Sequence, residues 1–404
     1  MTSADPGPAP AKRGAAQPAP AATPVAMALM TLAASALLAS AVFLGLRADE
    51  APLSPAAAEE AASERQKRLI RQLDQAKEEL GAWQDWYEDL ATVDRYPGAG
   101  PGILRTANGQ KALHDDELTR LHAEPRPEGP PLGPFEVLVD VSRQLRERGI
   151  DFVVVPVPPM AAVYPRRALE SAPEGGSIPP YLDWRLRAFY LALEREGVEV
   201  LDLLPTFLDP PAVPEAQLPV PEGAVGPSSI GLLYRYQDRH WSALGSHVAA
   251  GVVASRIERF PWFEELRRRE GQAVVHRRWM TATRRGRITN QLVNFGVLPP
   301  DAPPEVFLVR RSRIEGEKWS LVDTDSPILL IGDSFGGLEH GFQDALLARL
   351  GFRVDAVTVP GGRPSAQLDA LALRGNGLSG KRLVIWQFTT AALSKWARWR
   401  SREL

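Results

Sequence analysis

Residues 328–335 read ILLIGDSF, an apolar run that glycine, aspartate and serine close. A run of β-branched residues and leucine, followed by glycines and a helical pattern, predicts a buried strand, a tight turn and the start of a helix. This geometry lifts the hydroxyl of Ser334 out of the carboxyl edge of a sheet. It also places the backbone N–H of Ser334 at a helix N-terminus, where negative charge is favoured.

A base for this serine lies earlier in the chain, where residues 238–241 read DRHW. Neutral serine is a poor nucleophile, and an imidazole that takes its proton activates it. A carboxylate fixes the tautomer of the imidazole and stabilises its protonated form. Because residues two apart in an extended segment point to the same side, we expect Asp238 and His240 to be neighbours. The hypothesis is a triad of Ser334 as nucleophile, His240 as base and Asp238 as orienting carboxylate.

Each motif also has a structural interpretation. A Gly-Asp-Ser sequence is a common turn, and many histidines only complete the hydrogen bonds of a core or a surface. The two motifs in one chain, with Trp241 directly after the histidine, favour the catalytic interpretation.

The sequence that surrounds the two motifs has an α/β pattern. The expected helices are 135–148, 181–196, 241–257 and 338–350, and the expected strands are 152–157, 198–203, 328–331, 353–359 and 382–388. Nearly continuous apolar strands that alternate with helices indicate a parallel sheet covered on both faces. Ligands of such sheets bind beyond the carboxyl ends of the strands, which is where Ser334 falls.

The two blocks resemble those of the AlgX and AlgJ group of SGNH-hydrolase-like proteins, which are periplasmic enzymes of polysaccharide O-acetylation. The stretch GIDFVVVPVP at residues 149–158, with Tyr164 and Pro165 after it, is similar to the same group. Ordinary SGNH hydrolases carry the serine block first, whereas this chain has the order Asp, His, Ser, as the AlgX and AlgJ group does. The resemblance covers residues 135–390.

The resemblance implies a three-layer α/β/α SGNH-hydrolase-like domain with a mostly parallel sheet, at residues 135–404. It implies an exported polysaccharide as acceptor and a membrane-bound acyltransferase as the partner that supplies acetyl groups. For the oxyanion hole and the substrate, the candidate residues are Gly361, Gly362 and Trp241. The sequence has no nucleotide fingerprint and no metal-ligand spacing, so we expect no cofactor and no metal.

Two positions depart from the pattern of the group. Gln237 stands directly before Asp238, where the group usually has threonine or serine. The last strand, VIWQF at residues 384–388, lacks the acidic residue and the nearby arginine that the group leads us to expect after its tryptophan.

Composition narrows the class of protein. The chain has 404 residues, which is enough for one large or two ordinary domains. Its net charge of −2 argues against a general nucleic-acid binder. It contains no cysteine, so disulfides and thiolate metal sites are excluded.

The N-terminus predicts a membrane anchor; a cleaved signal peptide is the alternative, because residues 33–36, which read AASA, resemble a processing site. Residues 1–24 are rich in alanine and proline, which is typical of a disordered tail. Residues 25–46 follow without a charge, and as a helix this run is about 33 Å long, enough to span a hydrocarbon core of about 30 Å. Lys12 and Arg13 precede the run and only Arg47 follows it closely, which favours a cytoplasmic N-terminus and a periplasmic domain.

Residues 47–134 are predicted to form a helical stalk and then a linker rich in proline and glycine. The stalk has apolar residues at heptad spacing: Leu69, Leu73, Ala76, Leu80, Trp83, Tyr87 and Leu90. This seam predicts self-association through residues 66–90 or contact with a membrane partner. The alternative is an amphipathic helix that packs on its own domain.

Eight arginines and one acid lie within residues 267–287. They form either a solvated helix face or a surface that captures an anionic polymer, since arginine binds carboxylates through two hydrogen bonds. The candidate polymer-binding residues are Arg277, Arg278, Arg284 and Arg285.

The leading hypothesis is a membrane-anchored periplasmic O-acetyltransferase that works through an acetyl-serine intermediate. An esterase or deacetylase with the same triad, which uses water as the acceptor, is the first alternative. A non-catalytic subunit that binds polysaccharide or assists assembly is the second.

Overall fold

The computed structural model describes residues 55–78, 94–95, 103–105, 112–114, 133–165, 180–270, 274–316, 323–361, 363–393 and 399–404.

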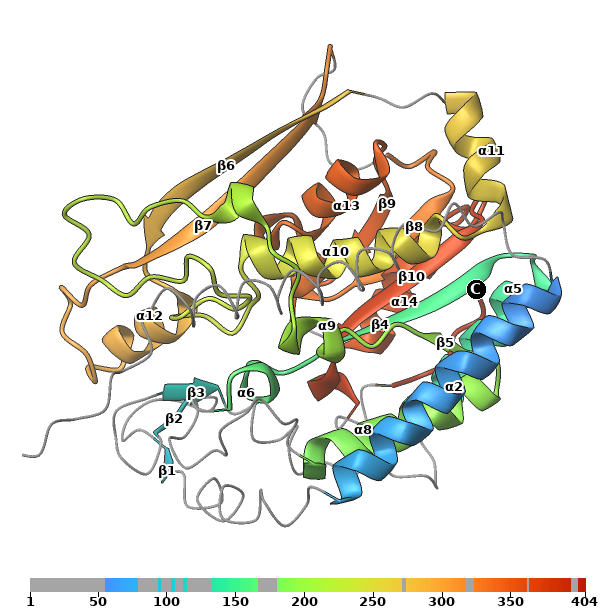
Figure 1. The fold of residues 1–404 in the computed structure, drawn as a ribbon, viewed down its shortest axis with the longest axis horizontal. Helices are drawn as coiled ribbons and strands as arrows, with labels where there is room; N and C mark the ends of the chain where they lie inside the picture. Colours follow the sequence, from blue (N-terminus) through green and yellow to red (C-terminus); the bar gives the residue numbers. More distant parts are fainter. Residues whose placement is uncertain are drawn as a thin grey trace, which may run out of the picture. The chain divides into compact units, whose positions relative to one another are not determined.

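A five-stranded parallel sheet forms the centre of the fold (Figure 1). Its strands, in spatial order, are β5 (Glu199–Val200), β4 (Asp151–Val157), β10 (Leu383–Thr389), β8 (Ile328–Gly332) and β9 (Asp355–Thr358). Each pair of neighbouring strands is parallel. The carboxyl ends of the strands therefore share one edge of the sheet, and the chain leaves β8 at that edge directly before Ser334.

Helices cover both faces of this sheet (Figure 1). One face packs on α10 (Ala243–Ile257) and α13 (Phe342–Leu350), with α9 (Leu204–Leu208) and α11 (Pro261–Glu270) beside them. The other face packs on α5 (Pro134–Glu147), α8 (Pro180–Arg195) and α14 (Pro364–Ala372).

The sequence of β8 explains why both faces are covered. Ile328 and Leu330 belong to one core cluster, whereas Leu329 and Ile331 belong to the other, and all four are fully buried. A strand that is apolar at every position needs a helix layer on each side. The predicted α/β fold with a mostly parallel sheet is confirmed.

Several further elements are short. They are α6 (Met160–Val163), the 3₁₀ helices η2 (Pro214–Ala216), η3 (Ser334–Gly336), η4 (Leu338–His340) and η5 (Thr390–Ala392), and a small antiparallel sheet of β1 (Asp94–Arg95), β2 (Ile103–Arg105) and β3 (Ala112–His114). The helix expected at 338–350 is divided into η4 and α13 by Gly341, whose φ is +76°.

An antiparallel hairpin of β6 (Val275–Arg284) and β7 (Glu305–Ile314) was not predicted. Much of the arginine-rich segment at 267–287 is therefore a strand, and its interpretation as a helix face is wrong beyond α11. The hairpin packs on α13, where Ile314 contacts Leu347. Between its strands the chain forms α12 (Arg287–Asn294), which was also missed, as was α14.

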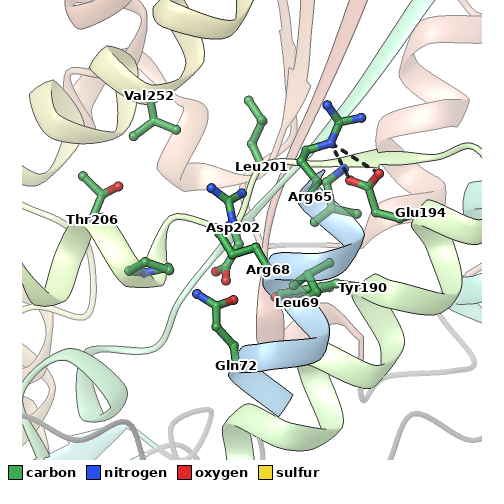
Figure 2. Close-up of a pocket in the computed structure, with 12 residues that line it drawn as sticks. Arg65, Arg68, Leu69, Gln72, Tyr190, Glu194, Leu201, Asp202, Thr206 and Val252 are labelled. Carbon is green, nitrogen blue, oxygen red and sulfur yellow. Dashed lines mark hydrogen bonds and ion pairs between the residues drawn. The ribbon is translucent and has the colours of Figure 1, made fainter. Parts of the chain in front are cut away.

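The described part of the predicted stalk is α2 (Pro55–Glu78), which packs along α8. Leu69 of α2 is 5% exposed and belongs to the same core cluster as α8. Beside it, Arg65 donates to the carboxylate of Glu194 at 3.2 Å, next to a small pocket between α2 and the 201–206 segment (Figure 2). For these residues, the structure favours a helix that packs on its own domain. Residues 79–93, which carry the rest of the seam, lie outside the described residues.

No helix within the described ranges combines the length and the apolar character needed to cross a membrane. The predicted tail and anchor, residues 1–24 and 25–46, lie outside those ranges. The predicted boundary at residues 134 and 135 stays a prediction.

Neighbouring residues of α2 provide a test of this packing. We expect Leu69→Ala to lower the free energy of unfolding by about 2 to 4 kcal/mol, because it removes buried methyl groups and leaves a cavity. Ile70→Ala is the matched control, since Ile70 is 41% exposed and its truncation should cost less than about 1 kcal/mol. Urea unfolding of the full-length chain measures both. Equal small effects would contradict packing of α2 on the domain.

Candidate functional site

The turn that carries Ser334 is built by the buried carboxylate of Asp333. This carboxylate caps η3 by accepting from the backbone N–H of Phe335 at 2.9 Å. It also accepts from Nε2 of Gln387 at 3.0 Å and from the backbone N–H of Thr389 at 2.8 Å. The side chain thus ties the end of β8 to the end of β10, and Ser334 stands at a fixed point on the sheet edge.

Gln387 fills the space beneath this turn. It is fully buried, and a Cβ atom at Gly332 or at Gly336 would lie 2.7 Å from its Oε1. Glycine at both positions therefore makes room for the glutamine. The last strand departs from the pattern of the AlgX and AlgJ group that the sequence resembles, but Gln387 has a defined structural role there.

The structure brings the three predicted triad residues together. Nδ1 of His240 lies 2.7 Å from Oδ1 of Asp238, and Nε2 of His240 lies 2.9 Å from Oγ of Ser334. An ionised carboxylate only accepts hydrogen bonds, so Nδ1 carries the proton and donates to Asp238. Nε2 then has a free lone pair and accepts the hydroxyl proton of Ser334, which is the arrangement that general-base activation needs.

Several groups hold Asp238 in its ionised form. Its Oδ1 accepts from the backbone N–H of His240, and its Oδ2 accepts from the backbone N–H of Arg287 at 3.2 Å. Nη1 of Arg235 lies 3.6 Å from the same Oδ2. Burial by itself raises the pKa of a carboxylate. The hydrogen bond from His240 and the charges of His240 and Arg235 outweigh it, so the pKa of Asp238 lies well below its usual value.

Arg235 is itself fixed by a carboxylate on the hairpin. Its Nη2 lies 3.3 Å from Oε2 of Glu305, the first residue of β7, and its guanidinium stacks 3.9 Å over the ring of Phe307. Glu305 also accepts from the backbone N–H groups of Tyr236 and Gln237. Burial raises the pKa of Glu305, and the charge of Arg235 opposes this. Glu305 and Arg235 thus attach the loop that carries His240 to β7.

Gln237, the other departure from the pattern of that group, joins the loop that carries His240 to α12. Its Nε2 donates to the carbonyl of Pro303, and its Oε1 accepts from the backbone N–H of Gly286. The backbone N–H of Ile288 donates to its carbonyl. A Cβ atom at Gly286 would lie 2.1 Å from that carbonyl oxygen, so the close approach requires glycine.

A cavity of about 600 Å³ opens beside Ser334. Its lining combines the triad with polar and charged side chains of η4 and of residues 284–294, and with two residues after β9: Asp238, His240, Arg284, Arg285, Arg287, Asn290, Gln291, Asn294, Ser334, Glu339, His340, Pro360 and Gly361. Ligand pockets are commonly 300 to 1,000 Å³, so the cavity has the volume of a small-molecule site. The sequence analysis did not identify His340, nor Asn290 and Gln291 of α12, whereas Asn294 was a weak candidate for the oxyanion hole.

The three residues proposed for the oxyanion hole and the substrate lie in different places. Gly361 lines the cavity, and Gly362 lies outside the described residues. Trp241 does not contact the cavity: it is 1% exposed and packs in the core, with its ring centroid 5.3 Å from that of Phe335 and 5.1 Å from that of Phe342. The expectation that Trp241 contacts substrate is therefore not met.

Of the four arginines proposed to bind a polymer, two line the cavity and two do not. Arg284 and Arg285 line the cavity, together with Arg287. Arg277 and Arg278 lie farther along β6, are exposed, and do not line it.

Residues 121–390 match the family described as "SGNH hydrolase-like domain, acetyltransferase AlgX". Similar solved structures include AlgX of Pseudomonas aeruginosa, with a TM-score of 0.52 and 17% identity over 72% of this chain and 62% of that one. The O-acetyltransferase domain of Pseudomonas putida AlgJ matches with a TM-score of 0.49 and 20% identity, over 73% of this chain and 92% of that one. No curated protein sequence matches the chain. Because the match covers 62% of AlgX, the chain spans less than two thirds of that protein. At 17% identity, the likeness to AlgX shows a shared fold.

The attachment of the loop to β7 can be tested with two glutamates of that region. We expect Glu305→Gln to lower the free energy of unfolding by about 3 kcal/mol, because it leaves the buried charge of Arg235 without its main partner. Glu315→Gln is the control, since Glu315 follows the other end of β7 and its side chain is 64% exposed. Denaturant unfolding measures both variants. A Glu305→Gln protein as stable as the control would contradict this role.

Proposed function

The chain belongs to the SGNH hydrolase-like acetyltransferase family of AlgX, and on this premise we propose that it is an O-acetyltransferase that acetylates hydroxyl groups of an exported or cell-wall polysaccharide. The observation that carries this proposal is the hydrogen-bonded series Asp238, His240 and Ser334 at a cavity of about 600 Å³.

The geometry supports a two-step mechanism. In the first step Oγ of Ser334 attacks the acetyl carbonyl of the donor while its proton moves to Nε2 of His240. The bond between the acetyl group and the donor oxygen breaks, His240 gives the proton to that oxygen, and an acetyl-serine remains. In the second step His240 takes the proton of a sugar hydroxyl, whose oxygen attacks the acetyl carbon. Ser334 leaves and regains its proton.

Negative charge on the carbonyl oxygen needs donors in both steps. We assign this role to the backbone N–H of Ser334, at the start of η3, and to a backbone N–H near Gly361, which lines the cavity. A donor of this kind is worth about 3 kcal/mol of transition-state stabilisation.

We assign Arg284 and Arg285 to the acceptor, because they lie in the same cavity as Ser334. Their guanidinium groups suit a carboxylate or another anionic substituent of the polymer. Arg277 and Arg278 form an outer part of the same basic surface and would meet units of the polymer that are farther from the reaction.

The N-terminal sequence and the family also support a proposal for the location of the protein and for its acetyl donor. We propose that residues 25–46 anchor the chain in the bacterial inner membrane with residues 135–404 in the periplasm. A membrane-bound acyltransferase would supply the acetyl groups there. Self-association through residues 66–90 would use residues of the seam other than Leu69, since Leu69 packs on the domain.

Acetyl transfer can be tested by mass spectrometry of the full-length chain treated with p-nitrophenyl acetate. We expect one acetyl group on Ser334, discharged faster by an oligosaccharide than by water. Ser334→Ala and His240→Ala should each abolish turnover, and the double variant should be no worse than either, because the residues act as a unit. Equal discharge by water alone would indicate an esterase. Turnover by Ser334→Ala would refute the nucleophile.

The two arginine pairs provide a matched test of acceptor binding. We expect Arg284→Gln/Arg285→Gln to raise the KM for a short anionic oligosaccharide about tenfold, the effect of about 1.4 kcal/mol of lost binding. Arg277→Gln/Arg278→Gln should leave that KM unchanged and weaken only long polymers, most strongly in dilute buffer. Steady-state kinetics at two salt concentrations measures both. Identical behaviour of the pairs would contradict the division of the surface.

A further inference from the structure

A second histidine, His340 at the end of η4, lies against the ring of His240. The two imidazole rings are stacked, with their centroids 3.7 Å apart and their planes at 11°. Both side chains line the cavity beside Ser334. The stack is therefore part of the site, although no step of the proposed mechanism uses His340.

The stack supplies a restraint that the hydrogen bonds of the triad do not. Asp238 and Ser334 bind the two ring nitrogens of His240, and these bonds act in the plane of the ring. Contacts with the ring face resist tilting out of that plane. His340 provides a parallel contact, and Phe335 a tilted one with centroids 4.7 Å apart. Productive sites hold their groups within about 10 to 20°, so a face contact has a direct effect on alignment.

The charge state of His340 suits this position. The pKa of His340 is lowered to about 3, mainly by burial and next by the nearby charge of His240. The charged groups around it come from the 235–240 segment, from β6 and from η4: Asp238, His240, Arg235, Arg284 and Glu339. Of those that act on its pKa, Asp238 raises it and the cations lower it. The lowered pKa of His340 favours the neutral form of its ring.

We propose that His340 is a positioning residue for His240: its uncharged ring keeps the imidazole in line between Asp238 and Ser334 and faces the positive charge that His240 acquires during proton transfer. This inference rests on the proposed acetyl-transfer function. The face of an aromatic ring attracts a cation above it, whereas a second positive charge at this distance repels it. Position 340 accordingly needs a ring without charge.

Three variants of the full-length chain separate the ring from the charge. His340→Phe keeps a neutral ring, His340→Ala removes the ring, and His340→Arg places a permanent charge on a planar group that can stack. The rate of acetyl release from p-nitrophenyl acetate is measured for each across the pH range. His276→Arg is the matched control, because His276 lies on β6 with its side chain 51% exposed and outside the cavity.

We expect His340→Phe to retain kcat within about threefold and His340→Ala to lose about tenfold in kcat with little change in KM, since alignment and not substrate binding is lost. His340→Arg should lose more. It should also move the acid limb of the pH profile to lower pH, because a neighbouring cation disfavours the protonated form of His240. The control should match the wild type.

Two outcomes would overturn the inference. One is a wild-type kcat in His340→Ala. The other is a His340→Arg variant whose rate of acetyl release is lower at every pH while the acid limb of its pH profile does not move, because that result indicates a packing defect alone. If His340→Arg does not fold, nuclear magnetic resonance of the His240 Nδ1–H replaces it. The proton should exchange with water faster in His340→Ala than in His340→Phe, and equal exchange would refute the role. Loss of turnover in Ser334→Ala tests the nucleophile separately, and faster discharge of the acetyl group by an oligosaccharide than by water tests the proposed transferase function.

Discussion

A buried ion pair between Arg235 and Glu305 determines where the proposed base lies. Two charges removed from water are stable only when each is paired and hydrogen-bonded. Glu305 meets this condition by accepting two backbone N–H groups of the loop as well as Arg235, and Arg235 meets it by also facing Asp238. The sheet thus supplies Ser334, the β6 and β7 hairpin holds His240, and the site exists only where the two structures meet.

The parts of this protein that sequence could predict are those with a local signal. The apolar strand before Ser334 and the Asp-x-His spacing each lie within a few residues, and both were found. The hairpin was missed because buried and exposed residues do not alternate along β6, and Arg277, Arg278 and Arg284 hold three of its exposed positions. Glu305 and His340 carry no local signal at all, since their importance comes from contacts with residues about 70 and 100 positions away.

The departures from the family pattern show a related limit. Gln387 and Gln237 were noted only as residues that differ from the expectation. In the structure Gln387 packs between two glycines beneath the serine turn, and Gln237 connects the base loop to α12. Each glutamine lies against glycines that are distant in sequence: Gln387 against Gly332 and Gly336, and Gln237 against Gly286. A single sequence does not reveal such contacts.

The position of α12 has a consequence for how this site can change over evolutionary time. Its first turn holds Asp238 through a backbone N–H group, which every residue type except proline provides. Farther along, its side chains Asn290, Gln291 and Asn294 line the cavity. Replacements at these three positions leave the support of Asp238 untouched, because that support does not depend on side-chain identity. One helix can therefore accept mutations that adapt the site to a different glycan while the chemical machinery is inherited unchanged.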